Sequence, residues 1–171
     1  MTHRALAVLG LVLALLSTAV PSAEAATGTA ADARKDAPAS IDITRVKVVN
    51  ALDRVSFKVK VRNLTTKGTF TLSVYDPASG SAGMDAKVTH KKGTAARVRV
   101  SNTDLDDTFG VDCPGVRAAW KSAKDVLKVS VPQSCYHFYS GPPSAWDVFV
   151  VAKGPKPGQK DRVDTFQVAR G

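Results

Sequence analysis

The side chains best suited to covalent or acid–base chemistry are few in this chain. It holds two cysteines, Cys113 and Cys135, and only His90 and His137 lie beyond the N-terminal apolar segment. The chain contains no Gly-x-Ser-x-Gly, His-Glu-x-x-His or Gly-rich phosphate-binding motif. Glu24 is the only glutamate, so a catalytic carboxylate pair would need two aspartates. We therefore expect a protein without catalysis or a cofactor, and a hydrolase is the least favoured alternative.

Residues 1–26 have the pattern of a secretory signal peptide. A short polar start carries Arg4, an apolar run covers residues 5–16, and Ala23-Glu24-Ala25 provides a small-x-small cleavage site. The apolar run is too short to remain as a membrane span. The sequence thus predicts a secreted, extracellular protein that no transmembrane segment retains.

Export determines how the cysteines are interpreted. An oxidising compartment favours a disulfide between Cys113 and Cys135, and two free thiols or an intermolecular bridge are the alternatives. The bridge would enclose a loop of about 22 residues, for which chain entropy gives roughly 3 kcal/mol of stabilisation. A metal site built from these two cysteines is not expected, because no histidine pair lies nearby.

Composition and periodicity predict one all-β domain. Residues 27–40 are small, polar and aperiodic, which indicates a disordered linker, and the folded domain is expected over 41–171. Alternation of apolar and polar residues predicts about nine short strands and an antiparallel β-sandwich, with a closed barrel as the alternative. Parity changes between Ile43 and Val46, which predicts either a bulge near Thr44 and Arg45 or a strand buried on both faces. The expected strands cover residues 41–49, 54–63, 69–75, 84–90, 95–101, 116–120, 126–131, 146–152 and 164–168.

The chain has a formal net charge of +9, and most of the excess lies in the first half of the domain. Residues 41–100 carry 12 Lys and Arg against 4 Asp, whereas residues 101–171 carry 9 against 8. Parity points several of the basic side chains outward, and they form one basic face if their strands share a sheet. Such a face would attract an anionic envelope polymer by counterion release, although it could also be an ordinary solvated face. The candidates are Arg45, Lys47, Lys58, Lys60, Arg62, Arg97 and Arg99.

Aromatic residues gather after the second cysteine, around a Gly-Pro-Pro segment. Exposed rings there would stack on sugars or anchor a partner, and buried rings would instead cover the disulfide. The candidates for a glycan site are Tyr136, Phe138, Tyr139 and Trp146. Few aromatics interleave with the basic residues, so nucleic acid is not the expected partner.

A short acidic stretch resembles the start of a calcium-binding loop. Asn102, Asp104, Asp106 and Asp107 place oxygen ligands at close spacing. The stretch departs from the EF-hand pattern because Asp107 stands where glycine is required and Cys113 where the bidentate glutamate would be. A solvated acidic turn is therefore the favoured interpretation, and no metal site is assigned.

Three segments carry a resemblance to known proteins: residues 42–46 (DITRV), 61–64 (VRNL) and 129–135 (VSVPQSC). They resemble small secreted proteins of high-GC bacteria that have no assigned activity. The strand pattern over residues 41–169 is similar to carbohydrate-binding-module and DOMON-like sandwiches. The resemblance implies a β-sandwich, and it implies no ligand-binding residue.

These observations together favour a secreted, monomeric, non-catalytic β-sandwich that binds or occupies the cell envelope. The alternative is a carbohydrate-binding module that uses the aromatic segment.

Overall fold

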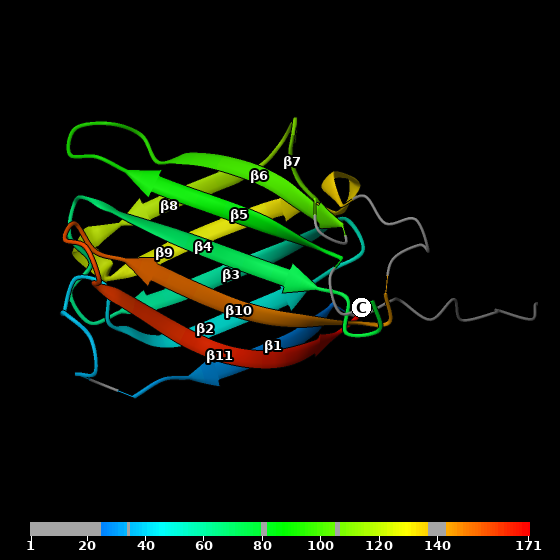
Figure 1. The fold of residues 1–171 in the computed structure, drawn as a ribbon, viewed down its shortest axis with the longest axis horizontal. Helices are drawn as coiled ribbons and strands as arrows, with labels where there is room; N and C mark the ends of the chain where they lie inside the picture. The colour runs from blue at the N-terminus through cyan, green and yellow to red at the C-terminus, as the bar shows by residue number, and fades with distance from the viewer. Residues whose placement is uncertain (1–24, 34, 80–81, 105–106, 137–142) are drawn as a thin grey trace, which may run out of the picture.

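The computed structural model describes residues 25–33, 35–79, 82–104, 107–136 and 143–171. These residues form two antiparallel β-sheets that pack face to face, as Figure 1 shows. Two short 3-10 turns, η1 (Ser122–Lys124) and η2 (Gln133–Cys135), are the only helical segments within the described ranges. The predicted all-β sandwich is confirmed, with eleven strands instead of nine. The signal peptide prediction falls almost wholly on residues 1–24, which lie outside the described residues.

The five-stranded sheet joins segments from the first half of the chain to a later hairpin. Its strands, from one edge to the other, are β1 (Ala26–Ala31), β2 (Ile43–Asn50), β3 (Arg54–Val61), β9 (Val126–Pro132) and β8 (Arg117–Lys121). The pairing of β3 with β9 brings together segments that lie more than 60 residues apart in the chain.

The six-stranded sheet covers the other side of the core. Its strands, in spatial order, are β11 (Lys160–Ala169), β10 (Ala145–Lys153), β4 (Gly68–Tyr75), β5 (Gly83–His90), β6 (Arg97–Asp104) and β7 (Asp107–Val111). In Figure 1, β1 and β11 lie together along one lateral edge of the sandwich, and β6 and β8 lie along the other.

The core lies between the sheets and follows from the alternation in the sequence. On β3, Val55, Phe57, Val59 and Val61 are buried, while the residues between them face outward. Apolar residues on β4 and β10 meet them from the opposite sheet. Burial of each large aliphatic side chain contributes about 1.5 to 3 kcal/mol, and this term drives the two sheets together.

The predicted bulge on the first expected strand is confirmed, because the register of β2 against β3 shifts between Ile43 and Arg45. Thr44 is the additional residue, and its hydroxyl donates to the Lys60 carbonyl at 3.4 Å. The bulge lets Ile43 and Val46 both face the core while Arg45 faces solvent.

The prediction of a disordered linker over residues 27–40 is wrong for its first part. Residues Ala26–Ala31 form β1, which pairs antiparallel with β2 and packs against β11. Gly28 contacts Val168 and Phe166 so closely that a Cβ at this position would not fit. A strand of Ala, Thr and Gly has no alternation of large apolar and polar residues from which it could be predicted. Backbone pairing with β2 at the edge of the sheet holds it in place.

The acidic stretch predicted as a loop is also partly extended. β6 continues to Asp104, and β7 pairs with it over Asp107–Val111. β7 covers only the Val100–Asp104 half of β6, so the Arg97–Arg99 half is a free edge of the six-stranded sheet. None of the helices in the described part of the chain has the length and hydrophobicity to cross a membrane.

Candidate functional site

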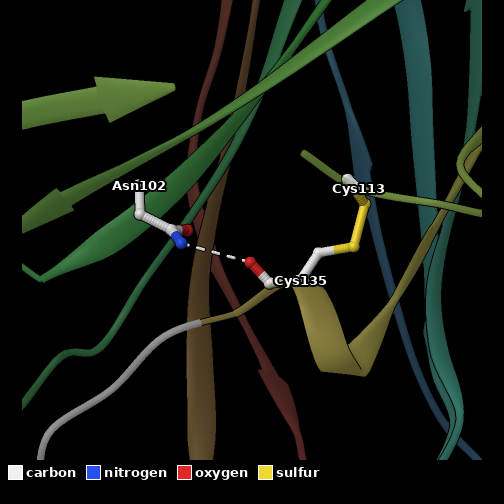
Figure 2. The surroundings of a disulfide bond; sticks show 3 residues. All are labelled: Asn102, Cys113 and Cys135. Atoms are coloured by element: carbon white, nitrogen blue, oxygen red, sulfur yellow. Dashed lines mark hydrogen bonds between the residues drawn. A yellow bond between two sulfur atoms is a disulfide. The ribbon is translucent and has the colours of Figure 1, made fainter. Parts of the chain in front are cut away.

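A disulfide joins Cys113 and Cys135, as Figure 2 shows, and confirms the predicted pairing. The two Cα atoms lie 5.4 Å apart, within the usual range for a bridge. Cys113 follows β7 and Cys135 ends η2, so the bridge closes the open end of the β8–β9 hairpin. The side-chain amide of Asn102 on β6 donates to the Cys135 carbonyl at 3.1 Å and ties this corner to the six-stranded sheet.

Of the four aromatic residues predicted to bind glycans, the structure describes two, Tyr136 and Trp146. The Tyr136 and Trp146 rings contact each other at a centroid distance of 5.0 Å. Trp146 is only 2% exposed, since its position on β10 faces the core. The Tyr136 hydroxyl is enclosed, and this burial raises the pKa of the phenol far above its ordinary value. The burial of Trp146 counts against an exposed platform at this ring, the Tyr136 side chain is only partly buried, and Phe138 and Tyr139 lie outside the described residues.

The calcium-loop candidates are not assembled into a site by the described residues. Asn102 is 1% exposed, and its amide is engaged by Cys135. Asp107 is exposed at the start of β7. Asp106 and the side chain of Asp104 lie outside the description.

A different group of carboxylates lies close together, near the end of β1 and the start of β11. Asp32, Asp36 and Asp161 each offer one oxygen, and these oxygens lie within 4.8 Å of one another. Burial raises the pKa of Asp32 and of Asp161, and the charges of neighbouring aspartates raise both further. Such oxygens are the ligands that a hard cation prefers. The sequence did not indicate this group because two members come from the predicted linker and the third follows 125 residues later.

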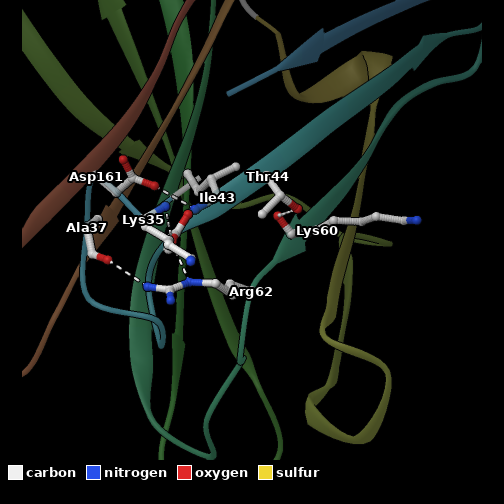
Figure 3. Close-up of polar contacts among 8 residues, drawn as sticks. Lys35, Ala37, Ile43, Thr44, Lys60, Arg62 and Asp161 are labelled. Carbon is white, nitrogen blue, oxygen red and sulfur yellow. Dashed lines mark hydrogen bonds and ion pairs between the residues drawn. The ribbon is translucent and has the colours of Figure 1, made fainter. Parts of the chain in front are cut away.

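Two carboxylates, Asp161 and Asp42, tie segments together in this region, and Figure 3 shows Asp161 beside Ile43. Asp161 accepts hydrogen bonds from the Ile43 and Arg162 amides at 2.5 and 2.9 Å. The fully buried Asp42 accepts from the Arg62 Nε at 2.6 Å and from the Lys35 amide at 2.9 Å. Arg62 also donates to the Ala37 carbonyl at 3.1 Å. Arg62 is therefore an ion-pair partner of the buried Asp42, and we do not count it in the basic face defined below.

The other basic residues predicted on the first two strands do share one face. Lys47, Lys58 and Lys128 are direct cross-strand neighbours on β2, β3 and β9. Arg45 and Lys60 form a second row beside them. The sequence pattern did not indicate that the β8–β9 hairpin adds Arg117, Lys121 and Lys128 to this face, because the pairing of β3 with β9 is not visible in the sequence. The basic face, as we define it, consists of seven exposed side chains: Arg45, Lys47, Lys58, Lys60, Arg117, Lys121 and Lys128.

No acidic side chain of the described residues neutralises the basic face. The ion pairs among the described residues are Arg54–Asp53, Arg62–Asp42 and Arg162–Asp164, and none of these residues belongs to the basic face. Like charges directly opposite on neighbouring strands destabilise a sheet. The face therefore carries an uncompensated positive potential.

The centre of the basic face is hollowed. Lys47, Lys58, Lys128 and Arg117 line a shallow depression of about 910 Å³. Small residues, among them Ser56, Ser130, Ala118 and Ala119, make up much of the rest of its lining. Long cationic side chains around short ones leave room for a ligand to lie along the sheet.

Arg97 and Arg99 do not join the basic face, because β6 belongs to the six-stranded sheet. The prediction of a single basic face is corrected for these two residues. They lie beside Lys87 of β5, with which Arg99 is in direct register.

His90, one of the two histidines beyond the N-terminal apolar segment, is half-buried at the end of β5. Its ring stacks on Trp120 at a centroid distance of 5.0 Å, and its Nδ1 lies 2.7 Å from the Thr66 carbonyl. Trp120 in turn donates to the Thr65 carbonyl at 2.7 Å. These contacts describe a packing role between the two sheets, and His137 lies outside the described residues.

Comparison with known proteins gives no further guide to this surface. No protein-family model, curated protein or solved structure matches the chain.

Proposed function

We propose that this protein is a secreted, non-catalytic module that binds a linear anionic polymer of the cell envelope through the basic face. The observation that carries the proposal is the row of Lys47, Lys58 and Lys128 on three adjacent strands, without an acidic partner among the described residues. A row of unneutralised like charges costs folding free energy. A ligand of opposite charge would recover that cost.

The arrangement of the charges favours a polymer over a single ion. Neighbouring strands lie about 4.8 Å apart, so the row presents positive charges at a regular repeat. A second row, Arg45 and Lys60, runs beside it. A chain with repeating phosphate or carboxylate groups would neutralise several of these side chains at once and release their counterions.

The lining of the depression favours a polymer without bases. Unpaired bases are held by stacking on exposed aromatic rings. Among the described residues, Phe57 is the only aromatic one that lines this depression, and it is 2% exposed. The surface therefore suits an envelope polymer better than a single-stranded nucleic acid.

The disulfide supports the proposed location. Structural disulfides persist in oxidising compartments and are rare in the cytosol. The bridge between Cys113 and Cys135 is thus compatible with an extracellular protein. The carbohydrate-binding alternative has less support at Trp146, whose ring is 2% exposed and contacts Tyr136.

The test is the binding of linear long-chain polyphosphate, measured by calorimetry at several NaCl concentrations. The triple variant Lys47→Gln, Lys58→Gln, Lys128→Gln should reduce the slope of log K against log salt by about 2 to 3, since each lost contact removes roughly 0.7 to 0.9. The control variant Lys153→Gln, Lys156→Gln, Lys160→Gln removes the same charge from exposed positions of β10, β11 and their connection. Equal loss in both variants, or none in the first, would contradict the proposal.

A further inference from the structure

A second group of unpaired cations lies on the opposite sheet, on the β5–β6 hairpin. Lys87, Lys91, Arg97 and Arg99 line a hollow of about 520 Å³ together with Thr89, Thr94 and Ala95. All four cationic side chains are exposed, and the described part of the lining contains no acidic residue. We call this surface the hairpin hollow.

The strand register concentrates the charge of the hairpin hollow. Lys87 lies directly opposite Arg99, and Arg97 lies opposite Thr89. None of the four cations takes part in an ion pair within the described residues. Two guanidinium groups on one strand offer permanent positive charge to the phosphate groups of a ligand.

The position of the hairpin hollow leaves it open to a ligand that arrives from the side. β7 pairs with β6 only from Val100 onward, so within the described structure the Arg97–Arg99 half of β6 pairs with β5 on one side and has no strand on its outer side. β8, the edge strand of the five-stranded sheet, contacts β6 across this side of the sandwich. Figure 1 shows β8 and β6 following the same lateral edge.

A third hollow connects the hairpin hollow to the basic face. Its lining includes Lys87 and Arg99, which also line the hairpin hollow. It also includes Val116, which lines the depression on the five-stranded sheet. The third hollow therefore shares lining residues with both surfaces beside the start of β8, and one carboxylate, Asp112, also lies in its lining.

From this continuity we propose that one phosphate-rich linear polymer binds both surfaces: it lies across the basic face, turns around the β8 edge, and places further phosphate groups in the hairpin hollow. This inference rests on the proposed function of the basic face. The path crosses three strand spacings from β2 to β8, the separation of the two sheets, and one spacing from β6 to β5. With about 4.8 Å per strand and about 10 Å between sheets, it is roughly 30 Å long.

The path length makes the inference testable with two probes of the same chemistry. Inorganic tripolyphosphate is too short to bridge the surfaces and should bind each independently, at two sites per protein chain. Long-chain polyphosphate should bind both surfaces with one molecule. Its second contact is then intramolecular, which raises the affinity at least tenfold above that of either surface alone.

Two variants separate this inference from the proposed function. The hairpin variant Arg97→Gln, Arg99→Gln should weaken long-chain polyphosphate about tenfold or more and remove one tripolyphosphate site. The basic-face variant Lys47→Gln, Lys58→Gln, Lys128→Gln should remove the other site. A hairpin variant that binds the long polymer as tightly as the parent chain overturns the inference and leaves the proposed function standing. A basic-face variant that binds like the parent overturns the proposed function itself.

Two further measurements test the roles of positive charge and of base stacking. The charge-retaining variant Arg97→Lys, Arg99→Lys keeps the free edge of β6 protected from strand pairing. It should bind the long polymer within a few-fold of the parent, and a loss as large as that of the Gln variant overturns the charge-based inference. Single-stranded DNA of matched charge should bind more weakly than polyphosphate, because no described residue that lines the hairpin hollow or the connecting hollow is aromatic. Tighter DNA binding overturns the choice of a base-free polymer.

Discussion

Lys58 and Lys128 lie directly opposite each other on β3 and β9, both exposed and neither with an ion-pair partner among the described residues. Direct cross-strand contact between like charges is unfavourable by a few tenths of a kcal/mol up to about 1. Lys47 on β2 repeats the arrangement on the other side of Lys58. The sheet thus retains a local destabilisation at the centre of the surface that we propose as its binding site.

The first prediction follows from that relationship. Replacement of Lys58 by Thr should raise the free energy of unfolding by about 0.2 to 1 kcal/mol, because it removes two like-charge contacts and adds a β-branched residue. Urea denaturation at low and high salt measures the gain, which should shrink as salt screens the repulsion. Lys156→Thr in the β10–β11 connection is the matched control and should change stability little. A Lys58→Thr chain that is less stable than the parent at low salt would contradict the interpretation.

The second prediction concerns the ion pair between Arg62 and the buried Asp42. Substitution of Arg62 by Ala leaves a buried carboxylate with only the Lys35 amide as hydrogen-bond donor among the described residues. Loss of one partner of a buried pair costs about 3 to 5 kcal/mol, and because Arg62 is 35% exposed we expect about 2 to 3. Asp53→Ala removes a 74% exposed partner of Arg54 and should cost less than about 1 kcal/mol. Similar losses in the two chemical denaturation curves would show that burial of Asp42 is not decisive.

The third prediction concerns the pH dependence of stability. The pKa of Asp32 is raised, mainly by burial and then by the charges of nearby aspartates, so the folded chain binds this proton more tightly than the unfolded chain does. Stability from this group is therefore present at acidic pH and is lost as pH rises through the raised pKa. Asp32→Asn should stabilise the protein at pH 7 and have little effect below about pH 3, where the carboxyl is protonated in both states. Melting temperatures across this range measure the difference. A gain of equal size at both ends of the range would exclude the charge as its cause.

The fourth prediction tests the burial of the aromatic pair beside the disulfide. Trp146→Ala should destabilise the protein by about 3 to 5 kcal/mol, since the indole is 2% exposed and contacts Tyr136. Phe109→Ala, at an aromatic position that is 44% exposed on β7, is the control and should cost less than about 1 kcal/mol. Chemical denaturation gives both values. Full retention of stability in the Trp146 variant would restore this ring as a candidate ligand contact.

The fifth prediction concerns the disulfide. Thiol titration of the denatured, unreduced protein should detect no free thiol, because both cysteines are bonded. Reduction opens a loop with a sequence separation of 22 residues and should lower stability by about 3 kcal/mol. Detection of two thiols per chain would instead leave Cys113 and Cys135 available for other chemistry.

Features that depend on neighbouring residues could be predicted from the sequence. Alternation over residues 54–61 indicated the buried face of β3, and the parity change near Thr44 indicated the bulge that directs Arg45 outward. The strands expected over residues 84–90 and 95–101 correspond to β5 and β6, which pair antiparallel. The cysteine pair indicated the disulfide, since two cysteines have only one intramolecular pairing. In each case the physical cause, side-chain period or chain chemistry, acts over a few residues or has one solution.

Other features depend on which distant strands pair, and alternation carries no information about that. Lys128 completes the lysine row only because β9 pairs with β3. Arg97 lies on the other sheet because β6 pairs with β5 in the six-stranded sheet. The sequence did not predict β1, because this strand has no apolar alternation and is held by backbone pairing with β2. Residue types and outward direction therefore came from the sequence by itself. The division of the charges between two surfaces, and the edge that connects them, was decided by the tertiary structure, because sheet order results from the burial of all the strands against one shared core.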